Sequence, residues 1–225
     1  MRKYILYQND NEKEIYIKHN IFNNIIYFKS HIYNNQQFNY NKPKYDNKYD
    51  LIYKNKLNQN QCNHQYSIKL ILEECINNNY NEIMILEYDI YFHKKFHKLY
   101  LEYNILIKNN SIIHLGSSQH QWNNIKIKKY KNITFYKNSH SLGTFAIILK
   151  KEMFNDYLNF INYNLSKINV FPTDVILSII SNNYKSIVIY PNLIICDISK
   201  STISIARDIK TLIQFKWNMN NYNII

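Results

Sequence analysis

The 225-residue sequence is poor in glycine, proline and cysteine, with two, three and three of these residues. The cysteines, Cys62, Cys75 and Cys196, lie far apart and form no CxxC pair. This spacing argues against both a disulfide framework and a cysteine-based zinc site. No apolar run approaches the roughly 20 residues of a membrane-spanning helix, so the sequence predicts no transmembrane segment.

The amino-terminal stretch MRKYILYQNDNEKE also lacks the features of a secretion signal. It becomes acidic and polar within a few residues, without an apolar core region or a cleavage site of small residues. We therefore expect a cytoplasmic protein, located in the host cytoplasm if the source is a virus.

Asparagine, isoleucine, lysine and tyrosine are abundant instead, while alanine and arginine are scarce. This skew is typical of an AT-rich genome, viral or bacterial. Hydrophobic residues make up 46% of the chain, which indicates a globular protein. The formal net charge of +12 comes almost wholly from lysines that occur in every segment. We therefore expect the lysines to serve solubility, and we expect no nucleic-acid partner.

Residues 1–60 show the weakest pattern. Short runs rich in β-branched and aromatic residues predict strands at 4–7, 15–18 and 25–29. The polar stretch 34–56 has almost no apolar periodicity and predicts a long loop. At this chain length, one domain overall is expected.

From residue 61 to residue 225, predicted helices and strands alternate. Apolar residues at helical spacing predict helices over 64–78, 96–107 and 154–161, and Pro172 opens another. Apolar runs predict strands at 82–86, 111–115, 133–136, 144–149, 186–190 and 193–195. This alternation predicts an α/β fold with a mixed or mostly parallel sheet, covered by helices on both faces.

Two carboxylates follow the predicted strand 82–86, in the sequence Glu87-Tyr88-Asp89. In such folds, ligands bind beyond the carboxyl ends of the strands. Carboxylate oxygens suit Mg²⁺ or Mn²⁺, which can also hold a diphosphate. The pattern is short, and a solvated acidic turn is the alternative.

Six segments within residues 61–220 carry a further pattern. They are QCNHQYSIKLILEEC, NEIMILEYDIYFHKKF, IIHLGSSQHQW, LGTFAIILKKEMF, FPTDVIL and YPNLIICDISKSTI. In order and spacing these segments resemble glycosyltransferase family 25 and related enzymes of the GT-A fold. Gly116, Gly143 and Ala146 fall on motif positions although glycine and alanine are rare in this chain.

The resemblance implies a GT-A-like fold and a metal-dependent glycosyltransferase. Asp89 would be the main ligand of a Mn²⁺ or Mg²⁺ ion, Glu87 a supporting one, and Asp197 a helper at the metal or diphosphate. The donor would be a nucleoside-diphosphate sugar, with a UDP-sugar favoured, and the acceptor a glycan or protein hydroxyl.

The resemblance also implies contacts to the substrates. The residues concerned are Gly116, Ser117, Ser118 and Gln119 along the cleft, Trp122 on a sugar face, Gly143 and Thr144 near the acceptor, and Arg207 at the diphosphate. Plainer roles remain open: a turn for Gly116, a core or lid position for Trp122, and a surface pair with Asp208 for Arg207.

Asp174 is the candidate general base. An inverting transfer needs a carboxylate that takes the proton of the acceptor hydroxyl as this hydroxyl attacks the anomeric carbon. Asp174 also suits the role of an acidic residue in the first turn of a helix, and both roles remain open.

The chain departs from the family at two places. The family's Glu-Asp-Asp is Glu87-Tyr88-Asp89 here, and the family's "iNLd.r..R" strand is not recognisable in KYILYQNDNEKE. We therefore assign residues 1–60 to a diverged part of the nucleotide-binding region with a polar loop, and 61–225 to the glycosyltransferase-like core. The alternatives are an inactive, glycosyltransferase-like binding protein and a basic nucleic-acid-associated protein.

A zinc site is the rival arrangement for the acidic segment. Asp89, His93 and His97 are spaced by four residues, so on a helix they would share one face and could bind zinc. The resemblance places Asp89 at the end of a strand instead, which argues against zinc.

Overall fold

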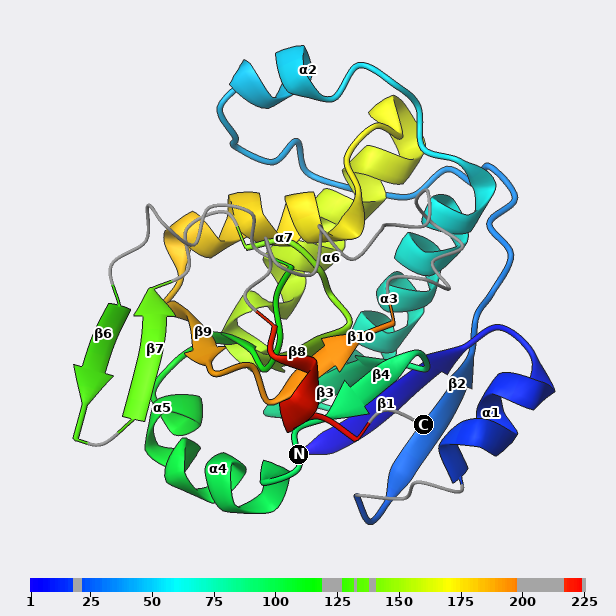
Figure 1. Cartoon of the computed structure of the whole chain (residues 1–225). Coiled ribbons are helices and arrows are strands. Elements are labelled where there is room, and N and C mark those ends of the chain that lie inside the picture. Colours follow the sequence, from blue (N-terminus) through cyan, green and yellow to red (C-terminus); the bar gives the residue numbers. More distant parts are fainter. Residues whose placement is uncertain (18–21, 119–126, 132, 138–140, 198–216, 224–225) are drawn as a thin grey trace.

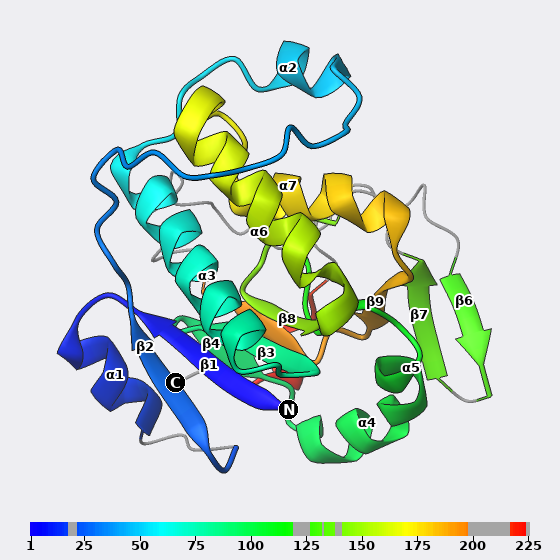
Figure 2. The same ribbon diagram turned by 180° about the vertical axis from the view of Figure 1, so that it is seen from behind.

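The central feature of the fold is an eight-stranded mixed sheet (Figures 1 and 2). The structure is a computed structural model that describes the chain except residues 18–21, 119–126, 132, 138–140, 198–216 and 224–225. Across the sheet, the strand order is β2-β1-β3-β8-β5-β9-β7-β6. The α/β class predicted from the sequence is therefore confirmed.

One half of the sheet is parallel and contains the amino-terminal strands. Strand β1 (Arg2–Tyr7) pairs in parallel with β2 (Ile25–Lys29) on one side and with β3 (Glu82–Glu87) on the other. In this register, Tyr4 lies opposite Ile26 and Ile85. The strands of residues 1–60 thus belong to the same sheet as those of the following core.

The other half of the sheet contains antiparallel pairs. Strand β8 (Ala146–Lys150) runs antiparallel to β3 and to β5 (Ile112–His114), and β9 (Ser186–Tyr190) is parallel to β5. Strand β7 (Ile133–Lys137) pairs antiparallel with β9 and forms a hairpin with the edge strand β6 (Ile127–Tyr130).

Three helices cover one face of the sheet, namely α3 (Gln59–Asn77), α6 (Phe154–Tyr163) and α7 (Thr173–Ile180) (Figure 2). Their apolar sides pack on alternate residues of the strands and form one core with Ile83 and Ile85 of β3. Such alternation is expected, because successive side chains of a strand point to opposite faces.

The other face carries a second core and a second, two-stranded sheet. Strand β4 (Ile90–Phe92) pairs antiparallel with β10 (Ile194–Cys196). Helices α4 (Phe96–Glu102) and α5 (Asn104–Lys108) follow, and their buried residues pack with Met84 and Leu86 of β3. The helix predicted over 96–107 is therefore present but divided at Tyr103.

The remaining elements are short. Helix α2 (Lys48–Ile52) interrupts the segment 34–56, which is otherwise irregular as predicted. Asn164–Ile168 forms a π-helical turn after α6, and 3₁₀ turns occur at Lys151–Met153, Ser181–Asn183 and Met219–Asn221.

A capping box starts helix α3 earlier than its apolar spacing indicates. The Asn58 side chain accepts a hydrogen bond from the Gln61 N–H, and the Gln61 side chain accepts one from the Asn58 N–H. Both contacts satisfy backbone donors that a helix start leaves free. The helix therefore begins five residues before position 64, and its first turns bring His64 to the end of the sheet.

The strand predicted at 15–18 is wrong, because residues 15–17 belong to helix α1 (Asp10–Ile17), and residue 18 lies outside the described residues. Asn9 and Glu12 cap its start: the Asn9 side chain accepts from the Glu12 N–H (3.2 Å), and Glu12 accepts from the Asn9 N–H (3.3 Å). Asp10 and Glu12 also place negative charge in the first turn, where it stabilises a helix. The capping pattern outweighs the β-branched run that suggested a strand.

Within the described part of the chain, no helix combines the length and apolar character that crossing a bilayer requires.

Gly116 fixes the distance between the main sheet and β10. A Cβ atom at this position would lie 1.9 Å from the Ile194 carbonyl oxygen and 2.6 Å from a ring carbon of Phe145. Next to this contact, the Leu193 N–H donates a hydrogen bond to the Leu115 carbonyl (2.7 Å).

We predict that Gly116→Ala lowers the free energy of unfolding by about 2 kcal/mol or more, because backbone must move to admit the methyl group. Urea denaturation measures this change, with the exposed Asn55→Ala as control. Equal stability of the two variants would contradict the close packing.

Candidate functional site

Polar side chains gather beyond the carboxyl ends of β1, β2 and β3. Glu87 is the last residue of β3, and Tyr88 and Asp89 connect it to β4. This edge of a parallel sheet is where ligands bind in open α/β folds. Two adjoining cavities open here, and both are lined by His64, Glu87 and Asp89.

The first cavity has a volume of about 200 Å³ and lies over the parallel strands. Its walls come from the segments that follow β1 and β2, from the first turns of α3, and from the β3–β4 connection. They include Tyr7, Gln8, Ser30, Ile32, Asn60, Asn63 and Tyr88.

The second cavity has a volume of about 330 Å³ and lies between the β3–β4 connection and the start of α7. Its walls include Ser118, Gly143, Thr144, Thr173, Asp174 and Asp197. The structure therefore brings together most of the described residues that the sequence singled out. His64, Glu87 and Asp89 stand where the two cavities adjoin.

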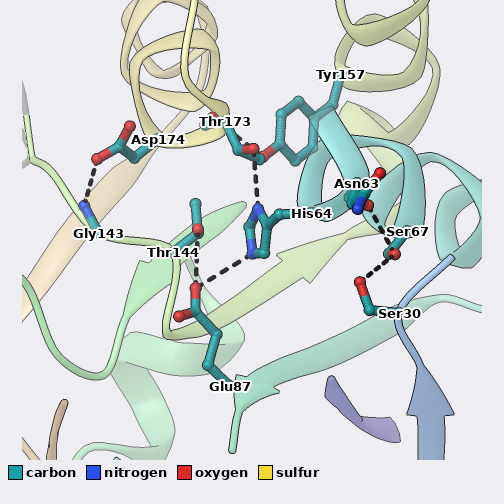
Figure 3. A network of polar contacts seen from close by, with 10 residues as sticks. All are labelled: Ser30, Asn63, His64, Ser67, Glu87, Gly143, Thr144, Tyr157, Thr173 and Asp174. Atoms are coloured by element: carbon teal, nitrogen blue, oxygen red, sulfur yellow. Dashed lines mark hydrogen bonds and ion pairs between the residues drawn. The ribbon is translucent and has the colours of Figure 1, made fainter. Parts of the chain in front are cut away.

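His64 connects the two sides of the site (Figure 3). Its Nε2 lies 3.2 Å from Oε1 of Glu87, and its Nδ1 lies 3.0 Å from Oγ1 of Thr173. The Thr144 hydroxyl donates to the same Glu87 oxygen at 3.4 Å. The Glu87 carboxylate is thus held by His64 of α3 and by Thr144, which precedes β8. The His64 imidazole also links it to Thr173 at the start of α7.

Asp174 lies in the first turn of α7 and is oriented by backbone donors. The Gly143 N–H donates to Oδ2 at 3.0 Å, and the Val175 N–H donates to Oδ1 at 2.9 Å. Gly143 has φ of +87°, which favours glycine at this turn. Burial raises the pKa of Asp174, and these two hydrogen bonds and His64 partly oppose the increase.

Asp89 is the least compensated acid of the site. Its Oδ1 atom is buried and has no hydrogen-bond partner among the described residues. Burial raises the pKa of Asp89, and the negative charges of Glu87 and Asp197 raise it further. A backbone hydrogen bond partly opposes this increase, but a buried carboxylate oxygen without a partner still favours either a proton or a bound cation.

Asp197 reaches this place through the small second sheet. Cys196 pairs with Ile90 in the β4–β10 ladder, and the Asp197 N–H donates to the Asp89 carbonyl at 2.6 Å. The Tyr91 hydroxyl donates to Oδ2 of Asp197 at 2.8 Å. Glu87, Asp89 and Asp197 therefore all line the second cavity, and Glu87 and Asp89 also line the first.

The donor set fits a divalent cation that is shared with a substrate. Among the residues that the structure describes, no three His, Cys, Asp or Glu side chains are close enough to hold a metal on their own. Mg²⁺ commonly binds through one or two carboxylates together with substrate phosphates and waters, so it does not require such a cage. The orphaned Oδ1 of Asp89 is the atom that fits this role best.

The glycine-serine segment after β5 plays a mainly structural part. Gly116 is buried against Ile194, and the Ser117 hydroxyl donates to the Leu142 carbonyl at 3.1 Å. Ser118 lines the second cavity, whereas Gly116 and Ser117 are not among the described residues of either cavity wall. The predicted site residues Gln119, Trp122 and Arg207 lie outside the described residues.

The rival zinc arrangement is wrong, because its three residues do not share a helix. Asp89 precedes β4, His93 forms a β-bridge with Tyr222, and His97 lies in α4. Nδ1 of His93 accepts a hydrogen bond from the Lys95 N–H at 3.0 Å.

His64 is a residue of the site that was not predicted from the sequence. Its partners Glu87 and Thr173 lie far along the chain, so no local spacing could reveal the contact. The one available signal is its place near the start of a predicted helix that precedes the acidic strand.

Comparisons with known proteins identify no family. No protein-family model matches the chain, and no curated protein sequence matches it. Among solved structures, it is similar to "A197 from STIV", at 10% sequence identity and a TM-score of 0.39, over 84% of this chain and 82% of that one. At this TM-score the likeness is too low to assign a fold or a function.

We predict that Asp89→Asn stabilises the protein at neutral pH in metal-free buffer. The raised pKa means that the folded wild type binds more protons than the unfolded chain, from the ordinary aspartate pKa of about 4 up to the folded value. The free energy of unfolding of the wild type therefore falls as pH rises through this window. Asparagine cannot ionise, so Asp89→Asn lacks this decrease.

The free energy of unfolding of Asp89→Asn should match wild type near pH 4 and exceed it by at least about 1 kcal/mol at pH 8. Urea denaturation at both pH values, with the exposed Glu102→Gln as control, measures the difference. A variant less stable than wild type at pH 8 would show that Asp89 is satisfied in the fold.

Proposed function

We propose that the protein is a glycosyltransferase that moves a sugar from a nucleoside-diphosphate donor to a hydroxyl acceptor. The observation that carries this proposal is the meeting of two cavities at an acidic strand end. One cavity can take the donor, the other can take the acceptor, and the carboxylates of Glu87 and Asp89 lie between them.

The topology supports a GT-A-type domain for this chain. Parallel strands β1, β2 and β3 lead to the first cavity, the antiparallel strand β8 follows β3 in the sheet, and a small second sheet supports the acidic turn. Among the motifs that resemble glycosyltransferase family 25, NEIMILEYDIYFHKKF contains Glu87 and Asp89, and FPTDVIL contains Asp174.

The first cavity suits the nucleotide. It lies at the carboxyl ends of parallel strands, and the side chains of Tyr7 and Tyr88 offer aromatic surface for a base or ribose. The family resemblance favours UDP-sugars as donors.

Asp89, with support from Glu87 and Asp197, would hold Mn²⁺ or Mg²⁺ together with the diphosphate. When bound, this ion supplies Lewis-acid stabilisation of the charge on the leaving diphosphate. The protein's own contribution is to keep the Oδ1 atom of Asp89 buried without a described partner, and to fix Glu87 through His64 and Thr144.

Asp174 would act as the general base. It lines only the second cavity, opposite the shared carboxylates, and its oxygens are oriented by the Gly143 and Val175 N–H groups. The carboxylate takes the acceptor hydroxyl proton while the hydroxyl oxygen bonds to the anomeric carbon and the bond to the diphosphate breaks. The raised pKa of Asp174 makes it a stronger base than an ordinary aspartate.

A donor screen with the purified protein and Mn²⁺ tests this function. We predict that a nucleoside-diphosphate sugar is consumed and that Asp174→Asn lowers the transfer rate by on the order of 10²-fold or more, while donor binding persists. Glu102→Gln, an exposed change on α4, should leave the rate unchanged.

Two results would count against the proposal. Equal rates in Asp174→Asn and wild type would remove Asp174 from the base role. If no donor is consumed although nucleotides bind, the protein is instead an inactive relative that uses the same site for recognition.

A further inference from the structure

The positive charge of the chain is concentrated in one segment. Residues 94–137 contain nine lysines and a single acid, Glu102, so they carry a net charge of +8 out of the +12 of the whole chain. Lysines do occur throughout the sequence, but elsewhere acidic residues largely cancel them. The segment includes α4, α5, β5, β6 and β7.

Eight of these nine lysines are described by the structure, and all eight are exposed. Lys94, Lys95 and Lys98 lie at or near the start of α4, and Lys108 ends α5. The others belong to the β6–β7 hairpin. None of the eight forms an ion pair with a described residue, so their charge faces solvent uncompensated.

Large apolar side chains are exposed among these lysines. Leu101 is 72% exposed, Ile105 42% and Tyr130 38%, and they make up half of the six large hydrophobic side chains exposed in the described chain. Leu101 and Ile105 are four residues apart across the junction of α4 and α5. Binding of a partner that removes these side chains from water would be favourable for each of them.

The two elements that carry these residues lie side by side (Figures 1 and 2). The Tyr103 hydroxyl, at the junction of α4 and α5, donates to the carbonyl of Thr134 at the start of β7, at 3.0 Å. The turn of the β6–β7 hairpin, with Tyr130 and Lys131, immediately precedes this contact. We call α4, α5 and this hairpin the basic face.

We propose that the basic face docks on the surface of an anionic lipid bilayer. Lysines near such a surface attract its negative headgroups, and apolar side chains that protrude between them can enter the boundary of the acyl chains. The basic face offers both at once: eight exposed lysines and three protruding apolar side chains.

The apolar side chains favour a bilayer over a nucleic acid. Single-stranded nucleic acids stack their bases on aromatic rings, and specific duplex contacts depend largely on arginine. The described basic face has no arginine, and two of its three protruding side chains, Leu101 and Ile105, are aliphatic. Aliphatic groups gain most from an acyl environment.

The basic face is separate from the two cavities. Helices α4 and α5 pack on the face of the sheet opposite to α3 and α7, which carry His64 and Asp174. The inference therefore does not rest on the proposed function, and changes on the basic face leave the site residues untouched.

Co-sedimentation of the full chain with vesicles tests the inference. We predict binding to vesicles of equal parts phosphatidylcholine and phosphatidylserine, little binding to phosphatidylcholine alone, and loss of binding as salt is added. The double variant Lys128→Glu/Lys129→Glu should weaken binding by roughly thirty-fold or more, because each lysine contributes about a factor of five near an anionic surface.

Leu101→Ser should weaken binding by about fivefold, because it removes an inserted apolar side chain. Matched controls are Lys54→Glu/Lys56→Glu and Ile52→Ser, which make the same changes at exposed positions in or just after α2, at the opposite end of the molecule (Figure 1). Circular dichroism confirms that each variant is folded.

Equal binding to both kinds of vesicle, or equal loss in the variants and their controls, would overturn the proposal. Duplex DNA provides the third comparison. If DNA binds in competition with vesicles and Leu101→Ser has no effect on either, the basic face is a polyanion surface and the bilayer assignment is wrong.

Discussion

The hydrogen bond from the Asp197 N–H to the Asp89 carbonyl joins two segments that are distant in sequence, and the site depends on this junction. Strand β10 can reach the acidic turn because Gly116 has no side chain and lets the Ile194 carbonyl pass close to it. The β4–β10 ladder then fixes both aspartates against one another. A methyl group at residue 116 would therefore displace β10 and change the positions of Asp89 and Asp197, although it contacts neither.

The acids that line the second cavity are not equally compensated by hydrogen bonds and ion pairs. Glu87 is accompanied by His64 and Thr144, and Asp174 is oriented by backbone N–H groups, whereas Oδ1 of Asp89 is buried without a described partner. Uncompensated groups of this kind are typical of functional sites, where stability is lower than the fold could provide. A cation and a diphosphate would supply the missing compensation, and this links the electrostatics of the apo protein to its proposed substrate.

Long apolar runs allowed most of the fold to be predicted from the sequence, whereas one local capping pattern and several contacts between distant segments account for what was missed. Strands such as 82–86 and 186–190 were correct because buried parallel strands are continuously apolar. Helix α1 was missed because its capping pair, Asn9 and Glu12, lies in a polar stretch before an isoleucine-rich run. Strand β4 has only three residues, and its partner lies about a hundred residues away. The acidic pair and Asp174 were singled out from local motifs, and the structure places them along one cavity, whereas His64 depends on partners that only the fold brings near.

Calorimetric titration of UDP tests the proposed role of Asp89 in a cation-dependent nucleotide site. We expect binding in the presence of Mn²⁺, no binding with EDTA, and no binding to Asp89→Asn, a variant that should be at least as stable as wild type. Glu102→Gln should bind UDP normally. Unchanged binding of UDP by Asp89→Asn would contradict this role of Asp89. Failure of the wild type to bind UDP, GDP or CDP would contradict the presence of a nucleotide site.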